Sequence, residues 1–191
     1  MNTINSFYTS NELKKLKFKK IGENNLISRL ARFYDIKNIE IGSNVRIDDF
    51  CILSGIIKLG NYVHISAYTA LYAKFGIELE DYTGLSPRCT VFSASDDYSG
   101  NYLIGPMVET QYVHIIGGKV TLKQYSQLGS NCVVLPGVTV MEGAAVGALS
   151  LIVHDLEPWK IYKGIPAKFF KERSKKILDI ILECNTSKTE I

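Results

Sequence analysis

Two neighbouring aspartates, Asp96 and Asp97, stand in the polar run Ser95-Asp-Asp-Tyr98. An ordinary carboxylate, with a pKa of about 4, is a weak base toward a hydroxyl group. A primary amine is a different partner, because it arrives mostly as an ammonium ion and becomes nucleophilic once it loses one proton. A carboxylate pair attracts and orients that cation and accepts or relays its proton. The pair therefore favours chemistry on an amine, although Asp-Asp also occurs simply in turns.

The histidines offer an alternative base, because imidazole is well matched to proton abstraction near pH 7. His64 is the histidine that we expect could face a groove and serve a hydroxyl acceptor. Its alternative role is that of a corner residue bonded to the backbone. His114 and His154 lie elsewhere in the chain, and the sequence has no close His-x-x-x-x-His pair, so we expect no metal site.

The elements that must hold these residues follow a six-residue repeat. The stretch from Leu122 to Thr139 forms three lines of six, each opening with an aliphatic residue and carrying Ser126, Cys132 or Val138 in its fifth place. One bulky and one small apolar position per six residues suit a chain that turns regular corners around a triangular interior. Such repeats are typical of a parallel β-helix.

The same frame covers most of the chain, with coils that open at Ile21, Ile41, Leu59 and Val140. The coil that opens at Leu79 breaks off after Asp96 and resumes near Lys119, which predicts an excursion loop over about residues 97–119. Long loops on rigid scaffolds often carry function, so we expect this loop to take part in the chemistry. The alternative is a lid, or a loop that contacts another subunit, with no catalytic part.

We expect a helix before the first hexapeptide repeat and another after the last. The run Thr9-Ser-Asn-Glu12 fits a capping box that opens a short helix over the first coil. The hexapeptide frame stops at Pro158-Trp159, and the apolar spacing from Ala167 through Ile181 predicts a second helix. We expect one all-β domain over residues 1–191, with an N-terminal cap at 1–20, the β-helix at 21–157 and a helical arm at 158–191.

Composition limits the classes of function. The net charge of +3 gives no support to nucleic-acid binding, and no run of 18 apolar residues exists that could span a membrane. The first residues lack the basic and then apolar pattern of a secretory signal, which predicts a cytoplasmic protein. Cys51, Cys89 and Cys132 fall in the fifth place of the hexapeptide, so we expect core residues and not disulfides.

The coils, together with Gly164-Ile-Pro-Ala-Lys168, resemble the hexapeptide acyltransferases, whose fold is a left-handed β-helix. The similarity covers roughly residues 20 to 175. The segments Val45–Gly55, Ser93–Gly100 and Ala145–Leu151 are similar to N-acetyltransferases that act on dTDP-4-amino-4,6-dideoxyglucose in O-antigen synthesis. The resemblance implies a homotrimer that binds acetyl-CoA and its acceptor in the grooves between neighbouring β-helices.

The resemblance also assigns roles to individual residues. In similar sugar O-acetyltransferases the excursion starts from a Ser-His-Asp-Tyr segment whose histidine is the base, and Asp96 occupies that position here. Acetyl-CoA is expected to contact Gly129, Ser130, Gly147, Ala148, Lys168 and Lys171, and the acceptor is expected to contact Ser95, Tyr98, Arg88 and Tyr72. The alternative explanation for the glycines and Ala148 is that small residues suit tight corners of the coil. For the two lysines it is that they belong to an exposed basic face. Trp159 would either stack on adenine or seal the end of the core.

Three hypotheses follow for the activity. The first is an N-acetyltransferase that acts on a nucleotide-linked amino sugar by direct attack in a ternary complex, with Asp96 and Asp97 handling the proton. The second is a sugar O-acetyltransferase with His64 as the base. The third is a β-helix subunit that serves only as a scaffold.

Overall fold

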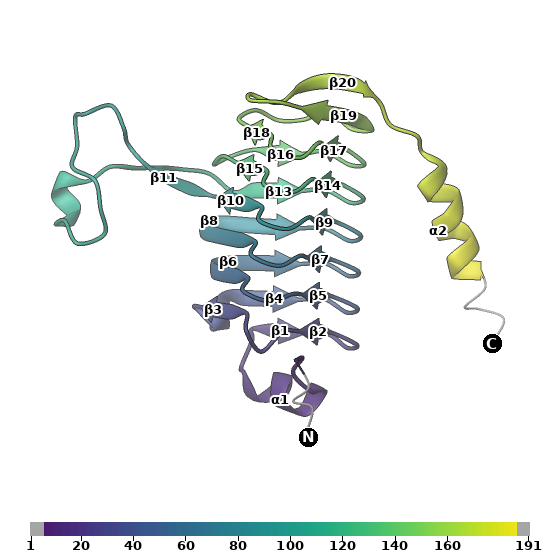
Figure 1. The fold of residues 1–191 in the computed structure, drawn as a ribbon. Helices are drawn as coiled ribbons and strands as arrows, with labels where there is room; N and C mark the ends of the chain where they lie inside the picture. Colours follow the sequence, from purple (N-terminus) through teal and green to yellow (C-terminus); the bar gives the residue numbers. More distant parts are fainter. Residues whose placement is uncertain (1–5, 187–191) are drawn as a thin grey trace.

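The computed structural model describes residues 6–186, in which the chain winds as a parallel β-helix with its coils stacked from one end to the other (Figure 1). One face carries a sheet of short strands, one per coil, closed by a final hairpin strand. These strands are β2 (Leu26–Ile27), β5 (Arg46–Ile47), β7 (His64–Ile65), β9 (Gly84–Leu85), β14 (Gln127–Leu128), β17 (Ala145–Val146), β19 (Lys160–Lys163) and β20 (Lys168–Glu172).

The other faces are covered by a second sheet, because its long strands β6 and β8 bend around a corner of the prism. Its members are β1 (Lys20–Ile21), β3 (Arg32–Tyr34), β4 (Ile39–Ile41), β6 (Ile52–Leu59), β8 (Ala70–Leu79), β10 (Thr90–Phe92), β13 (Val120–Leu122), β15 (Val133–Val134), β16 (Thr139–Val140) and β18 (Leu151–Ile152). The register of β6 against β8 shifts between Gly55 and Ile57. Gly55 has φ +94°, a left-handed conformation that glycine adopts without strain.

The interior confirms the six-residue frame. The aliphatic residues that open its lines, such as Leu122, Leu128 and Val134, have no exposed surface. Cys51, Cys89 and Cys132 are equally buried and are free thiols, as the fifth place of the hexapeptide predicts. Burial of a full aliphatic side chain contributes about 1.5–3 kcal/mol, so each coil adds several such contributions to the core.

The N-terminal cap is also confirmed. Helix α1 (Ser10–Lys15) begins at Thr9, whose side chain accepts from the Glu12 backbone while the Glu12 carboxylate accepts from the Thr9 backbone at 2.8 Å. Leu13 is buried against the hydrophobic core, so the helix closes the first coil.

At the C-terminal end the prediction of a helix from Ala167 is wrong over its first half. Residues Lys168–Glu172 form β20, antiparallel to β19, and helix α2 spans only Lys176–Thr186. The physical reason is that β19 adds one more parallel strand beyond Trp159 and would leave a bare sheet edge. The chain reverses at residues 164–167 and pairs with that edge. Arg173 then fastens it, donating to the backbone carbonyls of Tyr125 and Gly143 at 2.8 and 2.9 Å.

Aromatic residues form a ladder at one corner of the prism. Tyr62, Tyr82, Tyr125 and Trp159 all have φ near +60°, which is costly for a residue with a side chain. Their rings compensate by stacking from coil to coil, with centroids 4.7 Å apart for Tyr62 and Tyr82 and 5.6 Å for Tyr82 and Tyr125. Trp159, 8% exposed, ends this ladder with its ring centroid 6.2 Å from that of Tyr125, so it packs at the corner and not within the core cluster.

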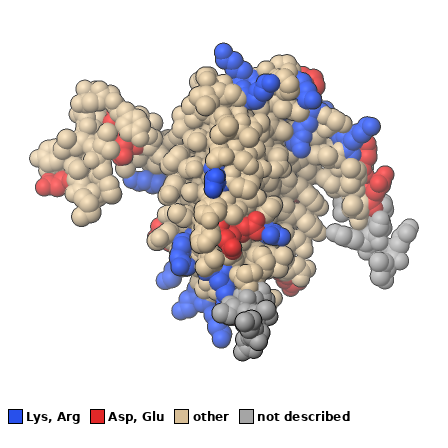
Figure 2. All heavy atoms as spheres, viewed as in Figure 1, with Lys and Arg blue, Asp and Glu red and all other residues tan. Residues whose placement is uncertain are grey.

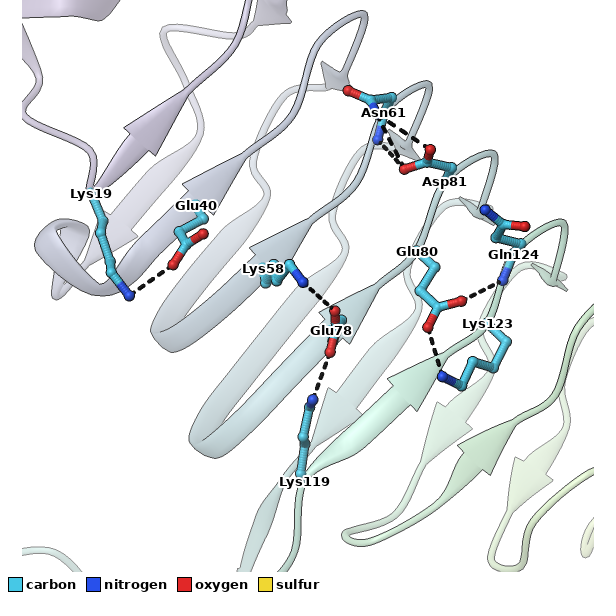
Figure 3. Close-up of polar contacts among 10 residues, drawn as sticks. All are labelled: Lys19, Glu40, Lys58, Asn61, Glu78, Glu80, Asp81, Lys119, Lys123 and Gln124. Atoms are coloured by element: carbon cyan, nitrogen blue, oxygen red, sulfur yellow. Dashed lines mark hydrogen bonds and ion pairs between the residues drawn. The ribbon is translucent and has the colours of Figure 1, made fainter.

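An ion network links three successive coils on a neighbouring face (Figure 3). The Glu78 carboxylate accepts from Lys58 Nζ at 2.8 Å and from Lys119 Nζ at 2.6 Å, and its side chain is only 17% exposed. The Glu80 carboxylate accepts from Lys123 Nζ at 2.7 Å and from the Gln124 backbone at 3.2 Å. The two lysines hold the pKa of Glu78 below its usual value.

We expect Glu78→Gln to lower the free energy of unfolding by about 1 kcal/mol at pH 7, because it removes a carboxylate shared by two cations. Since the folded-state pKa of Glu78 is lowered, its contribution is present above the unfolded pKa of about 4.3 and is lost as the pH falls through the folded value. Urea unfolding at neutral and acid pH tests this. Glu157→Gln, which removes a pair with Lys160 from an exposed carboxylate, is the control and should change little.

Candidate functional site

The excursion leaves the prism as a two-stranded ribbon that fixes the position of Asp96. Strand β11 (Ala94–Asp96) follows β10 and pairs antiparallel with β12 (Ile115–Gly117), so that Asp96 lies opposite Ile115 at the start of the arm (Figure 1). Between them the arm contains the short 3-10 helix η2 (Thr110–Tyr112). Gly117 has no room for a Cβ, because the Phe75 ring would lie within 2.1 Å of it. Phe75 therefore holds the returning strand against the prism.

Asp96 lines a hollow of about 330 Å³ between the arm and the prism. Its walls combine polar groups from Ser95, Tyr98 and Lys74 with apolar groups that include Phe92 and Leu135. A second hollow of about 440 Å³ adjoins it, since Lys74 and Ala94 line both. No histidine is among the residues that line either hollow. A carboxylate is thus the basic group presented there.

Asp97 occupies a different environment from Asp96. Its carboxylate accepts from the Ser99 backbone at 2.7 Å and pairs with His114 Nδ1 at 3.0 Å, across the base of the arm. The His114 ring and then the Ser99 backbone hold the pKa of Asp97 at about 2. His114 also lies against Tyr102, with ring centroids 4.9 Å apart. These bonds tie the two sides of the arm together. Asp97 therefore binds within the arm, whereas Asp96 lines the hollow.

His64 lies in β7, in the sheet of short strands, and does not line the hollows beside Asp96. Its Nε2 is 2.9 Å from the carboxylate of Asp48 and 3.5 Å from the hydroxyl of Ser66. Ser66 and Asp48 therefore both contact Nε2 of His64. A Ser-His-Asp triad needs them on opposite nitrogens, so this cluster is not arranged for nucleophilic catalysis by serine.

The residues expected to bind the cofactor gather in the last coils. The turns after β14 and β17 lie one above the other, since Gly129 N donates to Val146 O and Leu149 N donates to Ser130 O, both at 2.8 Å. Gly147 and Ala148 occupy the second of these turns. The turn that leads to Lys168 is bonded to the same coil, because Leu151 N donates to Gly164 O and Ala167 N donates to Leu151 O. Lys171 follows in β20, on the outer strand of the hairpin.

The residues expected to bind the acceptor divide into two groups. Ser95, Tyr98 and Tyr72 line the two adjoining hollows. Arg88 lies instead at a corner of the prism, with its guanidinium 5.6 Å from the centre of the Tyr68 ring. The sequence-based argument missed Lys74 and Phe92. For Lys74 the signal was available, because residues two apart in a strand project to the same side, which places Lys74 with Tyr72 in β8.

The described part of the chain has neither a metal-ligand cluster nor a membrane-spanning helix. Among residues 6–186 no three His, Cys, Asp or Glu side chains come together in a way that could hold a metal ion. Within the same range, neither α1 nor α2 is long and apolar enough to cross a membrane.

Comparison with known proteins shows the family, although no family model matches the chain. The dTDP-4-amino-4,6-dideoxy-D-glucose acyltransferase of Escherichia coli is 43% identical over 172 residues, covering 88% of this chain and 90% of that protein. AntD, an N-acyltransferase of Bacillus cereus whose structure holds dTDP and 3-hydroxybutyryl-CoA, is 46% identical, with a TM-score of 0.94 over 97% of this chain and 100% of its own. A hexapeptide-repeat acetyltransferase of Vibrio cholerae, 18% identical, shares the fold with a TM-score of 0.62 over 86% of this chain and 76% of its own. The chain is an acyltransferase and belongs to the family of the Escherichia coli dTDP-4-amino-4,6-dideoxy-D-glucose acyltransferase and the N-acyltransferase AntD.

Proposed function

We propose that this protein transfers an acyl group from acyl-CoA to the amino group of a nucleotide-linked amino sugar. Acetyl-CoA is the donor to test first, and dTDP-4-amino-4,6-dideoxyglucose is the first acceptor, because related acyltransferases are named for it or bind it. The observation that carries the proposal is the carboxylate of Asp96 in a hollow that no histidine lines. An ammonium group is the partner that such a carboxylate attracts.

The proposed reaction is a direct attack in a ternary complex. The amino group enters the hollow as an ammonium ion and gives one proton to Asp96, either directly or through Ser95 or Tyr98. The free amine then attacks the thioester carbonyl carbon, the carbon–sulfur bond breaks, and the thiol of CoA leaves with a proton. Orientation of the amine toward the donor supplies much of the acceleration, because it converts a bimolecular encounter into a reaction within one complex.

The donor is proposed to lie along the stacked turns of the last coils. Gly129, Ser130, Gly147 and Ala148 offer small side chains, beside which a pantetheine arm can run close to the backbone. Lys168 and Lys171, on the adjoining hairpin, would pair with the phosphates of CoA, where a point charge is sufficient.

A homotrimer is the proposed assembly, and the arm supports it. Its tip exposes Leu103 at 59%, Ile104 at 52% and Met107 at 95%, while Figure 2 shows few charged atoms over the arm. A neighbouring copy in a closed ring would cover such a surface. A monomeric mass in light scattering would contradict the shared groove.

We also propose that residues 1–191 form one domain and that the protein works in the cytoplasm. A single cluster of buried residues, which runs from Leu13 to Tyr162, supports the first statement. The second is supported by the cysteines of the described chain, Cys51, Cys89, Cys132 and Cys184, which are all free thiols as a reducing compartment would keep them.

A thiol-release assay with acetyl-CoA separates the proposed activity from its alternatives. Release with amino sugar nucleotides, and not with acceptors that carry only hydroxyl groups, is the expected result. The reverse pattern, abolished by His64→Ala, would establish the O-acetyltransferase. Absence of release with every acceptor would favour a scaffold without catalysis.

A further inference from the structure

The arm joins the prism at Ser93, the residue between β10 and β11, where the chain leaves the sheet that contains β8 and β10 (Figure 1). Ser93 has no exposed surface. Its hydroxyl accepts from the backbone N–H of Phe75 at 2.8 Å and donates to the carbonyl of Tyr72 at 3.2 Å. Its backbone N–H donates to the same carbonyl at 3.0 Å, and its own carbonyl accepts from the N–H of Gly118 at 3.0 Å. Ser93 thus links β8 to both ends of the arm.

The hydroxyl of Ser93 takes the place of a neighbouring strand. The pairing of β10 with β8 ends at Phe92, and β11 pairs with β12 in a separate two-stranded sheet. The N–H of Phe75 still requires an acceptor, because a backbone donor shielded from water and without a partner costs about as much as a lost hydrogen bond. A serine hydroxyl can accept that bond and donate another at the same time. The side chain therefore completes the backbone bonding of β8 where the arm departs.

Phe75 is held from two sides at this junction. Its backbone bonds to Ser93, and its ring packs against Gly117, where an added Cβ would lie 2.1 Å from the ring. Gly117 belongs to β12, the returning strand of the arm, and Gly118 after it bonds to Ser93. The departing strand, the returning strand and β8 therefore meet at one buried serine, which fixes the direction of the arm.

A second buried serine shows that small size alone does not explain these contacts. Ser126 also has no exposed surface, yet its hydroxyl finds no hydrogen-bond partner among residues 6–186. There the side chain serves only to fill the small fifth place of the hexapeptide. The hydroxyl of Ser93, in contrast, is used both as a donor and as an acceptor. The two serines form a matched pair for testing what the hydroxyl contributes.

Ser93 lies among the residues that form the hollow beside Asp96, although it does not line the hollow itself. Its chain neighbours Phe92 and Ala94 line the hollow together with Lys74 of β8. Asp96 follows three residues later, at most about 10 Å along an extended chain. A change of about 10° in the direction of the chain at Ser93 would then displace Asp96 by about 2 Å. A misplacement of about 1 Å can lower a rate by about a hundredfold.

We infer that Ser93 is a positioning residue for acyl transfer, because its hydroxyl fixes the direction of the arm and so holds the Asp96 carboxylate in the hollow. The inference rests on the proposed function, in which Asp96 takes a proton from the amine. Ser93 acts through Asp96 and touches neither the acceptor nor the acyl donor. Loss of its hydroxyl should therefore lower the turnover number and leave the binding of both substrates nearly unchanged.

The first test is Ser93→Ala, measured by thiol release with acetyl-CoA and the amino sugar nucleotide well below the thermal midpoint. The turnover number should fall by about ten- to a hundredfold, while KM for each substrate stays within about threefold of the wild-type value. The thermal midpoint should fall by several degrees. Ser126→Ala, the same change at the unpartnered hydroxyl, is the control and should alter neither the turnover number nor KM.

Ser93→Cys is a second variant that keeps the space filled, as Cys89 and Cys132 do at other buried positions. Because a thiol is a weak donor and a weak acceptor, its turnover number should lie between those of Ser93→Ala and the wild type. This variant measures the effect of weaker hydrogen bonds without a cavity.

A double-mutant cycle with Asp96→Asn separates positioning from a general structural role. In that background Ser93→Ala should lower the turnover number by less than about threefold further, because no carboxylate remains to be positioned. If the two losses multiply, or if Ser93→Ala turns over at the wild-type rate, the inference is wrong while the proposed function stands. If the wild type releases no thiol with any amino sugar nucleotide, both are contradicted.

Discussion

The variant Asp96→Asn should lower the turnover number by about a hundredfold or more, the usual range for loss of a general base. Asparagine keeps the size of the side chain, so the ribbon of β11 and β12 and the hollow of about 330 Å³ should persist. What is lost is the negative charge that attracts the ammonium group and accepts its proton. The measurement is the rate of thiol release at saturating acetyl-CoA and amino sugar nucleotide.

The pH dependence of the same variant gives an independent check. Raising the pH should restore part of the rate of Asp96→Asn, because solvent then removes the proton that the carboxylate would have taken. His64→Ala is the control, since His64 pairs with Asp48 and does not line the hollow. A variant Asp96→Asn that works at nearly the wild-type rate, alongside an inactive His64→Ala, would show that the base has been assigned wrongly.

The variant Gly129→Ala should lose about 1–3 kcal/mol of stability, the typical range for overpacking. A Cβ at this position would lie 2.6 Å from the backbone nitrogen of Ala148 and 2.9 Å from the carbonyl oxygen of Val146. Backbone atoms of a stacked coil cannot rotate away as a side chain can, so the two coils must separate. For a chain of this length each kcal/mol lowers the thermal midpoint by about 2–4 °C. Thermal and urea unfolding measure the loss.

Gly147→Ala is the matched control for this prediction. Its nearest neighbour would be the Cβ of Lys163 at 3.3 Å, a contact that a small shift relieves. We expect a loss of less than about 1 kcal/mol. If Gly129→Ala were as stable as the wild type but had a raised KM for acetyl-CoA, the glycine would serve the cofactor alone and the packing argument would fail.

The sequence predicts the β-helix well because its signal is local and repeated. Leu122, Leu128 and Val134 stand six residues apart, and each faces the interior in its own coil without help from distant parts of the chain. The capping box at Thr9 and Glu12 is local in the same way. In contrast, Phe169 and Phe170 lie in a strand and not in the expected helix because β19 has an open edge with which they pair. The spacing of the two residues does not reveal that edge.

The site was only partly predictable for a related reason. Asp96 could be found because the six-residue repeat breaks beside it. The different environment of Asp97 could not, because it depends on a contact with His114, which lies 17 residues further along the chain. Lys74 could have been found from its position two residues after Tyr72 in one strand. Its place beside Asp96 depends on the pairing of β8 with β10 and on the course of the arm, which local spacing does not reveal.

The most direct test of the proposed activity compares two acceptors that differ at one atom. The protein is incubated with acetyl-CoA and either dTDP-4-amino-4,6-dideoxyglucose or its analogue with a hydroxyl group at the same carbon. The rate at which acetylated product forms is measured by mass spectrometry. The account predicts acetylation of the amino sugar nucleotide, with a kcat/KM at least about a hundredfold above that for the hydroxyl analogue. Equal acetylation of both acceptors, or acetylation of the hydroxyl analogue alone, would contradict it.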